Sequence, residues 1–463
     1  MNVPAPHHRP AEAPHHAEPV EGHRPEPADG RRPEPVEGSA LDHRELGREM
    51  RIFDSSPLVG PGLPLWLPAG AAVRYELEQY AREVALRTGC EPVYSPVLGK
   101  RSLFERSGHW AKFADDMFPP MSLGSGPDGE PDADPLVLRP ANCPHHAQIY
   151  ASEPRSYRDL PVRYSEIGSM FRAERSGVLS GLSRVRQISL DDVHVFCRPD
   201  QVEAEVRTAL VAILEVLETL GIEVSYLRLS GRDDSDKWLG APEQWAAAEE
   251  ALRAALDDVA AGLDWHAEPG EAAFYGPKID VQVLDARGHE ESVATVQIDF
   301  NQPERFDLAY VAASGERERV VMIHRGTLGA MERMVAFLLE RHGGRLPFWL
   351  APVQVCLLPV SGPSTGSGGR DEPGVQEIDE LAADLRGRGL RVRVERDGSL
   401  GNRIRLSRQR RDALLGVLGP REVEAGVLAV TDPASGAKAS VPLAELGDRL
   451  AAAARSRARR VEF

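Results

Sequence analysis

Three arginines, Arg172, Arg184 and Arg333, are the first residues of this chain whose type suggests chemistry. A guanidinium group stays charged at physiological pH, and its planar fork of N–H groups binds the oxygens of a carboxylate or a phosphate in pairs. A single arginine more often forms a surface ion pair. Where a carboxylate and a phosphate must meet, fixed guanidinium groups would suit the stabilisation of the charge that develops between them.

A second group of residues could also do chemistry. It consists of one cysteine and two histidines, Cys143, His194 and His324. They are separated by 51 and 130 residues, so no local spacing identifies them as metal ligands. Taken singly, each is better explained as a buried core residue. Together, one Cys and two His would leave one position open on tetrahedral zinc, which is the arrangement of a substrate-binding site.

These residues need a scaffold that brings them together. Runs rich in β-branched residues, bounded by Gly, Pro and Asp, predict strands at 162–167, 279–284 and 293–300, and near 93–94. Apolar residues at helical spacing predict a helix that includes 73–84 and ends at Gly89, and a second helix over 201–220. The pattern therefore predicts an α+β fold, an antiparallel sheet flanked by helices, with the site on the sheet.

The pattern changes near residue 351, where strands and helices begin to alternate. Strands at 353–359, 390–394 and 427–430, with helices at 375–385 and near Ile404, predict an α/β domain over 351–463. The Gly- and Ser-rich segment 361–374 is expected to be a mobile surface loop. Residues 1–40 carry an eight-residue Glu-Pro repeat, so we predict a disordered tail before a main domain at 41–350.

Composition excludes several classes of protein. No stretch approaches the roughly 20 apolar residues of a membrane span, and the sequence starts without a signal peptide, so we expect a cytoplasmic protein with no membrane partner. The four cysteines have no paired spacing, which is typical of a reducing compartment. The net charge of −16 argues against a basic surface, so nucleic acid would bind at a local patch. The basic run at 403–411 is either such a patch or a solvated helix face.

Seven segments in a fixed order resemble the threonyl-tRNA synthetase family, from about residue 41 to the end of the chain. They are LDHRELG (41–47), RPANCPHH (139–146), RYSEIGSMFRAE (163–174), DDVHVFC (191–197), AFYGPKID (273–280), TVQIDF (295–300) and MIHRGTLGAMER (322–333). The resemblance implies a class II synthetase fold with a C-terminal anticodon-binding domain. It also implies that ATP, with Mg²⁺, activates threonine as the aminoacyl adenylate, and that the acyl group then passes to tRNA.

The resemblance assigns roles to the charged residues. Arg172 matches the arginine that bridges the amino-acid carboxylate and the α-phosphate, and Glu174 the residue that accepts from the adenine amino group. Arg184 matches a further phosphate contact, and Arg333 the arginine at the γ-phosphate. Lys278 would assist the negatively charged intermediate.

The resemblance also makes Cys143, His194 and His324 the ligands of one substrate-binding zinc ion per chain. In the family this ion takes the amino group and the side-chain hydroxyl of threonine together. Valine, which lacks the hydroxyl, would therefore be rejected. The other implied amino-acid contacts are Asp192, which accepts from the hydroxyl, Tyr275 and Gln297.

Three positions of the implied site depart from the family. Ile188 replaces a phenylalanine that stacks on adenine, Leu190 a glutamine and Ala141 a methionine, so the cavity should be larger and less polar. The choice between threonine, serine and another β-hydroxy amino acid therefore stays open. In the C-terminal domain Glu424 is at a base-reading position, but Thr-Asp-Pro at 431–433 replaces arginines, which leaves anticodon recognition open.

Three functions remain in competition. The first is a threonine–tRNA ligase, either the housekeeping enzyme or a specialised copy, and with only the tail before its core we expect it to lack an editing domain. The second is an adenylating enzyme that delivers the acyl group to another acceptor, such as a carrier protein. The third is a non-catalytic or resistance paralogue, which the retained Arg172, Glu174, Arg333 and metal-type residues argue against. Family members dimerise through their first motif, so we expect a homodimer formed by the helix from Val73 and the segment around Pro96.

Overall fold

The computed structural model describes residues 42–122, 134–235, 238–260, 262–360 and 375–463. The predicted tail at 1–40 and the predicted surface loop at 361–374 lie outside these ranges. Within the described residues, no helix combines the length and the apolar character needed to cross a membrane.

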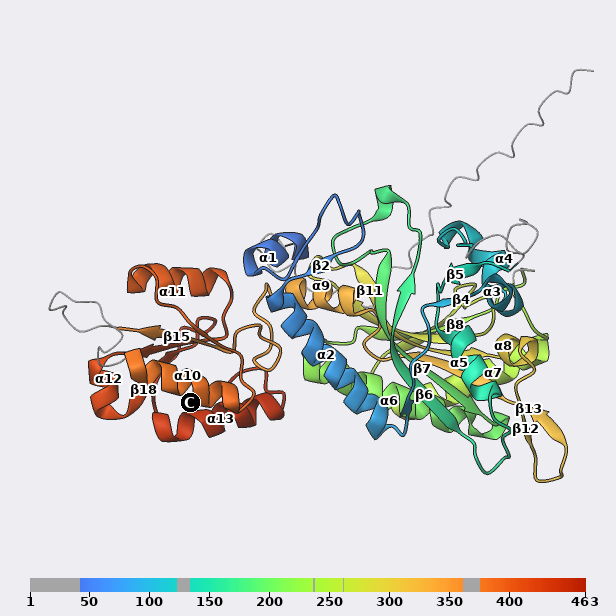
Figure 1. Ribbon diagram of the computed structural model, residues 1–463. Helices are drawn as coiled ribbons and strands as arrows, with labels where there is room; N and C mark the ends of the chain where they lie inside the picture. The colour runs from blue at the N-terminus through green and yellow to red at the C-terminus, as the bar shows by residue number, and fades with distance from the viewer. Residues whose placement is uncertain (1–41, 123–133, 236–237, 261, 361–374) are drawn as a thin grey trace, which may run out of the picture. The chain divides into compact units, whose positions relative to one another are not determined.

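An eight-stranded sheet organises the larger part of the chain (Figure 1). Neighbouring strands from β6 to β8 are antiparallel, which confirms the predicted antiparallel sheet. The two edge pairs, β3 with β6 and β8 with β9, are parallel, which the sequence pattern did not predict. In spatial order the strands are β3 (Glu91–Pro92), β6 (Val162–Phe171), β7 (Gln187–Cys197), β14 (Val321–Gly326), β11 (Glu290–Asp299), β10 (Lys278–Leu284), β8 (Tyr226–Gly231) and β9 (Trp265–Pro269).

Along the chain, α-helices precede, separate and follow the strands of this sheet. The two predicted helices are present, and the first begins earlier than predicted because Pro68 fits the first turn, where no N–H is required. The second ends where Gly221 adopts a left-handed conformation, with φ of 71°. The helices are α1 (His43–Met50), α2 (Pro68–Arg87), α3 (Arg101–Ser107), α4 (His109–Phe113), α5 (Cys143–Ala151), α6 (Val202–Leu220), α7 (Pro242–Val259), α8 (Asn301–Arg305) and α9 (Met331–Arg341).

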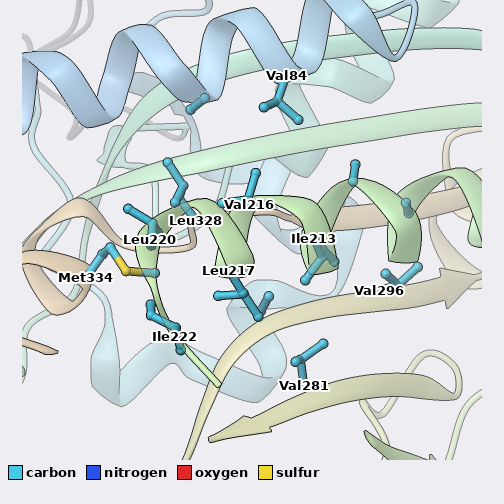
Figure 2. Close-up of a cluster of buried hydrophobic side chains, with 14 of the residues drawn as sticks. Val84, Ile213, Val216, Leu217, Leu220, Ile222, Val281, Val296, Leu328 and Met334 are labelled. Atoms are coloured by element: carbon cyan, nitrogen blue, oxygen red, sulfur yellow. The ribbon is translucent and has the colours of Figure 1, made fainter. Parts of the chain in front are cut away.

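Period-two alternation gives the central strands two different faces. On β7, Val193 and Val195 belong to the main hydrophobic core, together with apolar residues of α6. Figure 2 shows this core, with Ile213 and Leu217 of α6 near the strand residues Val281 and Val296. The alternate residues of the same strands include polar side chains, such as Asp192 and His194 of β7, beside apolar ones such as Phe196, which belongs to a second cluster. One face of the sheet therefore packs on the main core, and the other, which we call the polar face, carries the polar side chains together with this second cluster.

Shorter elements complete this part of the chain. Three two-stranded sheets join β1 (Phe53–Asp54) to β2 (Leu65–Trp66), β4 (Leu98–Lys100) to β5 (Leu136–Leu138) and β12 (Ala309–Val311) to β13 (Arg317–Arg319). Single 3₁₀ turns lie at η1 (Ala114–Asp116), η2 (Ser176–Val178) and η3 (Pro199–Gln201).

The C-terminal part forms the predicted alternation of strands and helices. Its five-stranded sheet has β15 parallel to both of its neighbours, β16 and β17, whereas β17, β18 and β19 are antiparallel. Arg403, in the predicted basic run, is buried and donates to the carbonyls of Pro359 and Glu395, so it is neither a phosphate contact nor a solvated residue. The elements are β15 (Val355–Pro359), α10 (Val375–Gly387), β16 (Val392–Val394), α11 (Leu400–Gln409), β17 (Leu414–Leu418), α12 (Pro420–Ala425), β18 (Val427–Thr431), β19 (Lys438–Pro442) and α13 (Leu443–Arg455).

Candidate active site

The register of the large sheet aligns four predicted site residues in one row. Lys278 lies opposite Gln297, Gln297 opposite His324, and His324 opposite His194. Directly opposite residues of antiparallel strands point to the same face. The row therefore runs across β10, β11, β14 and β7 on the polar face of the sheet.

A cavity of about 590 Å³ opens on this face and collects the predicted site residues from distant parts of the chain. Lys278 is the exception, since the described lining residues do not include it and its Nζ lies 2.8 Å from the Asp280 carboxylate. The predicted residues that line the cavity are Ala141, Cys143, Arg172, Glu174, Arg184, Ile188, Leu190, Asp192, His194, Tyr275, Gln297, His324 and Arg333.

The cysteine and the two histidines form a compact group at one part of this cavity. Cys143 is the first residue of α5, His194 lies on β7 and His324 on β14, and one ligand atom of each lies within 4.8 Å of the others. His194 Nε2 is 2.9 Å from His324 Nδ1. Thiolate and imidazole donors suit zinc, so the residues present fit that ion. Burial raises the pKa of the Cys143 thiol well above its ordinary value, and a bound cation would favour the thiolate instead.

Asp192 lies beside this group on the same face of β7, two residues before His194. It is 7% exposed, and burial raises the pKa of its carboxyl group, which the neighbouring His146 and His324 partly counter. Asp192 Oδ1 is 3.7 Å from His194 Nε2. A carboxylate in this position can accept a hydrogen bond from a ligand that also contacts the Cys–His–His group.

Tyr275 and Gln297 form a hydrogen-bonded pair at the wall of the cavity. The Tyr275 hydroxyl donates to Gln297 Oε1 over 2.5 Å, and Gln297 Nε2 donates to Thr295 Oγ1 over 3.3 Å. Burial raises the pKa of Tyr275 well above its ordinary value, so its hydroxyl stays protonated as the donor. These contacts fix the orientation of the Gln297 amide.

The guanidinium groups occupy another part of the cavity. Arg172 follows the last residue of β6, and Arg333 lies in the first turn of α9. Burial lowers the pKa of Arg172, and the nearby Arg333 lowers it further while Glu174 raises it. Arg184 Nη2 is 2.8 Å from Glu174 Oε2, so these two residues form an ion pair with each other. Two like charges that line one cavity favour an anionic ligand between them.

Apolar side chains also line the cavity. Leu190 and Ile188 precede Asp192 on the same face of β7, and their cross-strand partners on β6 are Gly168 and Met170. Ala141 lies two residues before Cys143 and also lines the cavity. The three residues that the resemblance marks as departures therefore line one cavity.

Two further residues beside the Cys–His–His group, His109 and Asp299, were not predicted from the sequence, although Asp299 lies in a quoted motif. His109, at the start of α4, has its Nε2 3.6 Å from the Cys143 sulfur and its Nδ1 2.8 Å from the Ser107 hydroxyl. Burial lowers the pKa of His109 to about 4, so it is neutral at physiological pH. Asp299 Oδ2 lies 3.0 Å from His324 Nε2. Residues that act at such separations in sequence are identified only by the fold.

Comparison with known families defines the class of protein first. Residues 128–342 match the tRNA synthetase class II core domain (G, H, P, S and T), and residues 354–453 match an anticodon binding domain. The sheet and the guanidinium site described above therefore belong to a class II aminoacyl-tRNA synthetase fold.

Individual relatives narrow the class. The threonine–tRNA ligase of Bacillus velezensis is 46% identical over 392 residues, which cover 84% of this chain and 58% of that protein. The crystal structure of the RNA binding domain of threonyl-tRNA synthetase from Cryptosporidium parvum has a TM-score of 0.79 at 33% identity, with 89% of this chain and 98% of that one covered. A putative threonyl-tRNA synthetase, ThrRS-1, from Aeropyrum pernix has a TM-score of 0.77 at 29% identity, with 91% and 98% covered.

The chain belongs to the threonyl-tRNA synthetase family. It spans less than two thirds of the length of the bacterial ligases that it matches.

Proposed function

We propose that this chain activates threonine with ATP as the aminoacyl adenylate and transfers the threonyl group to tRNA. The observation that carries the proposal is that one cavity is lined both by the Cys143–His194–His324 group and by the guanidinium residues Arg172 and Arg333. The first can bind an amino acid through a metal ion, and the second can bind the anions that react. We assign this chemistry to residues 41–350 and tRNA binding to 351–463.

The amino acid is proposed to bind at Cys143, His194 and His324, which we call the metal-type group. These three residues would hold a zinc ion there, which would supply a Lewis acid for the amino group and the hydroxyl of the substrate. Asp192 accepts the hydrogen bond of that hydroxyl. Tyr275 and Gln297, already oriented by their mutual hydrogen bond, contact the rest of the amino acid.

ATP, with Mg²⁺, is proposed to bind toward the guanidinium groups. Arg172 bridges the amino-acid carboxylate and the α-phosphate, which brings the two anions together and stabilises the charge of the transition state. Arg333 contacts the γ-phosphate. Glu174 and Arg184, paired with each other here, separate so that the first accepts from the adenine amino group and the second contacts a phosphate. Ile188 packs on the adenine ring.

Lys278 is proposed to act through its charge. Its ammonium group is held by Asp280, which also accepts from Arg228 and Ser230, so this lysine is fixed at the end of the row that contains His324. A positive charge at that point favours a negatively charged intermediate over a distance.

The acceptor is proposed to be a tRNA rather than a carrier protein, because residues 354–453 match an anticodon binding domain. Glu424, at the end of α12, is exposed and is free to contact a base. The turn at 431–433 lacks a basic side chain, so we expect weaker selection of the anticodon than in relatives with arginines there.

We also propose a cytoplasmic homodimer formed through α2 and the segment that follows it. Large apolar side chains are exposed there, with Tyr75 60%, Leu86 59% and Tyr94 84% exposed. A symmetric pair would bury these residues against their copies.

Two assays in sequence test the proposal. Pyrophosphate exchange with a panel of amino acids measures adenylate formation, and charging of threonine tRNA measures transfer. We expect exchange with threonine and charging of that tRNA. Exchange without charging would favour the carrier-protein alternative, and no exchange by metal-replete protein would favour the non-catalytic paralogue.

A further inference from the structure

His146 lies directly behind His194 on the side away from the metal-type group. The side chain of His146 is completely buried, and its Nδ1 is 2.8 Å from His194 Nδ1. Its other nitrogen, Nε2, is 3.1 Å from Glu166 Oε2. Hydrogen bonds therefore connect Glu166 to His146 and His146 to His194, whose own Nε2 faces His324 and the cavity.

These contacts are mutually consistent with only one proton arrangement when the ligands hold a metal ion. A carboxylate only accepts hydrogen bonds, so the proton of a neutral His146 stands on Nε2 and is donated to Glu166. His146 Nδ1 is then an acceptor, and His194 must carry its proton on Nδ1. The lone pair of His194 is consequently on Nε2, the nitrogen that faces the metal-type group.

The carboxylate of Glu166, the first group in this chain of hydrogen bonds, is held in place by other side chains. Arg139 Nη2 donates to Glu166 Oε1 over 3.0 Å, and the Ser95 hydroxyl donates to Oε2 over 2.6 Å. Arg139 is 1% exposed, and its other N–H groups donate to Ser169 O and Ser95. These hydrogen bonds also stabilise the negative charge of Glu166. Glu166 lies directly opposite Asp192 in the sheet.

We propose that His146, held by Glu166, is a positioning residue that fixes the ring orientation and the tautomer of His194 for metal binding. The inference rests on the proposed function, because it assigns the metal-ligand role to His194. His324 has a matching support in Asp299, 3.0 Å from its Nε2. Each histidine ligand thus has a buried partner behind it, as metal-bound histidines generally do.

Two amide variants separate orientation from simple burial. His146→Asn places a carbonyl oxygen near the position of Nδ1, so an acceptor for His194 is kept. His146→Gln places its amide near the position of Nε2, so the contact with Glu166 is kept and the acceptor for His194 is lost. We expect His146→Asn to retain zinc affinity within a few fold, and His146→Gln to lose about 10–100-fold.

The matched control is His145, the preceding residue of the same helix. It is also buried, but its Nε2 faces the carbonyl of Leu98 at 3.4 Å and not His194. His145→Gln is expected to leave the zinc affinity unchanged. All variants are made in the full chain, and their thermal unfolding is compared to show that they fold.

Zinc affinity is measured by competition with a chromophoric chelator, and the ligand field by the visible spectrum of the cobalt-substituted protein. Equal zinc affinity and equal cobalt spectra for His146→Asn and His146→Gln would overturn the inference, whether both match the unmodified chain or both are weakened alike. Absence of zinc binding by the unmodified chain would instead contradict the proposed function. Normal zinc binding and threonine activation, with no difference between the variants, would contradict only the role of His146.

Discussion

His194 and His324 stand opposite each other on the antiparallel neighbours β7 and β14, with His194 Nε2 2.9 Å from His324 Nδ1. One ligand atom of each histidine and the sulfur of Cys143 lie within 4.8 Å of one another, although the histidines are 130 residues apart in the sequence. The outer nitrogen of each histidine is occupied by a buried partner, His146 or Asp299. The inner nitrogens are therefore the ones available to a cation.

Loss of one metal-type side chain should remove amino-acid activation and spare ATP binding. In Cys143→Ala and His324→Ala we expect zinc content to fall well below one ion per chain, because two ligands bind far more weakly than three. Pyrophosphate exchange should fall with it, while the dissociation constant for ATP changes by less than about threefold. Cys197→Ala is the control, since this cysteine is buried in the main core outside the cavity. Full exchange by a metal-free preparation would contradict this prediction.

Replacement of Arg172 should lower the rate of adenylate formation more than it weakens substrate binding. In the proposed function the guanidinium group stabilises charge that develops in the transition state, so Arg172→Ala should reduce exchange by about 10²–10³-fold. Arg172→Lys should recover only part of this, because an ammonium group cannot bind two oxygens in a fork. Arg317→Ala is the control, since Arg317 forms an exposed ion pair with Asp307. A normal rate constant with a raised KM would contradict the role in the transition state.

Glu166 should make the stability of the fold depend on pH in the acid range. Burial alone would raise the pKa of Glu166, but hydrogen bonds from His146 and Ser95 and the charge of Arg139 lower it to about 2. Its contribution is therefore fully present above its unfolded pKa near 4.5 and decreases as the pH falls toward 2. In urea titrations, Glu166→Gln should be less stable than the unmodified chain at pH 7, by roughly 3 kcal/mol.

The same comparison at lower pH supplies the test. The difference in unfolding free energy between the two chains should shrink between pH 5 and pH 3, because Glu166 begins to gain a proton in the unfolded state first. A difference that stays constant over this range would show that the ionised carboxylate is not the source of the stability.

The exposed apolar residues on and after α2 should hold two chains together. Light scattering of the purified chain at micromolar concentration should give the mass of a dimer. Leu86→Glu or Tyr94→Glu should shift the mass toward that of a monomer, because a buried charge without a partner is unfavourable. Val211→Glu is the control, since Val211 is a similarly exposed apolar residue on α6. A monomer of the unmodified chain would contradict the proposed interface.

Helices and strands could be predicted from the sequence where apolar residues recur at the spacing of a helix or a strand. Helix α6 was predicted within one residue, since its apolar face and the glycine at its end are local signals. The parallel edge pairs could not be predicted, because β3 is only two residues long and the sequence does not say which strands are neighbours.

The site could be predicted only as far as the motifs extended. Cys143 and Arg172 lie in segments that resemble the family, and both line the cavity. The roles of His146 and Glu166 were not predicted, although both lie in quoted motifs, because their partners come from other strands and helices. Lys278 was predicted as a site residue, but its ammonium group pairs with Asp280, two residues along the same face of β10, and the described lining of the cavity does not include it.

The apolar residues Leu190 and Ala141 of the cavity should lower the selectivity of the enzyme for threonine over serine. Leu190 and Ala141 are apolar and leave space beside Asp192, and serine differs from threonine by one methyl group, which is worth roughly 1–3 kcal/mol in a pocket. We therefore expect measurable activation of serine beside threonine. Leu190→Gln should shift the ratio of the two, whereas Val311→Gln, at an exposed residue of β12, should not.

Pyrophosphate exchange with threonine and valine at equal concentration tests the central claim most directly. Valine has nearly the shape of threonine but lacks the hydroxyl, so it would leave Asp192 and the metal-type group without a partner. We predict that threonine is activated at least about 10³-fold more efficiently than valine. Valine activated as well as threonine would contradict the assignment of Cys143, His194, His324 and Asp192 as the group that reads the hydroxyl.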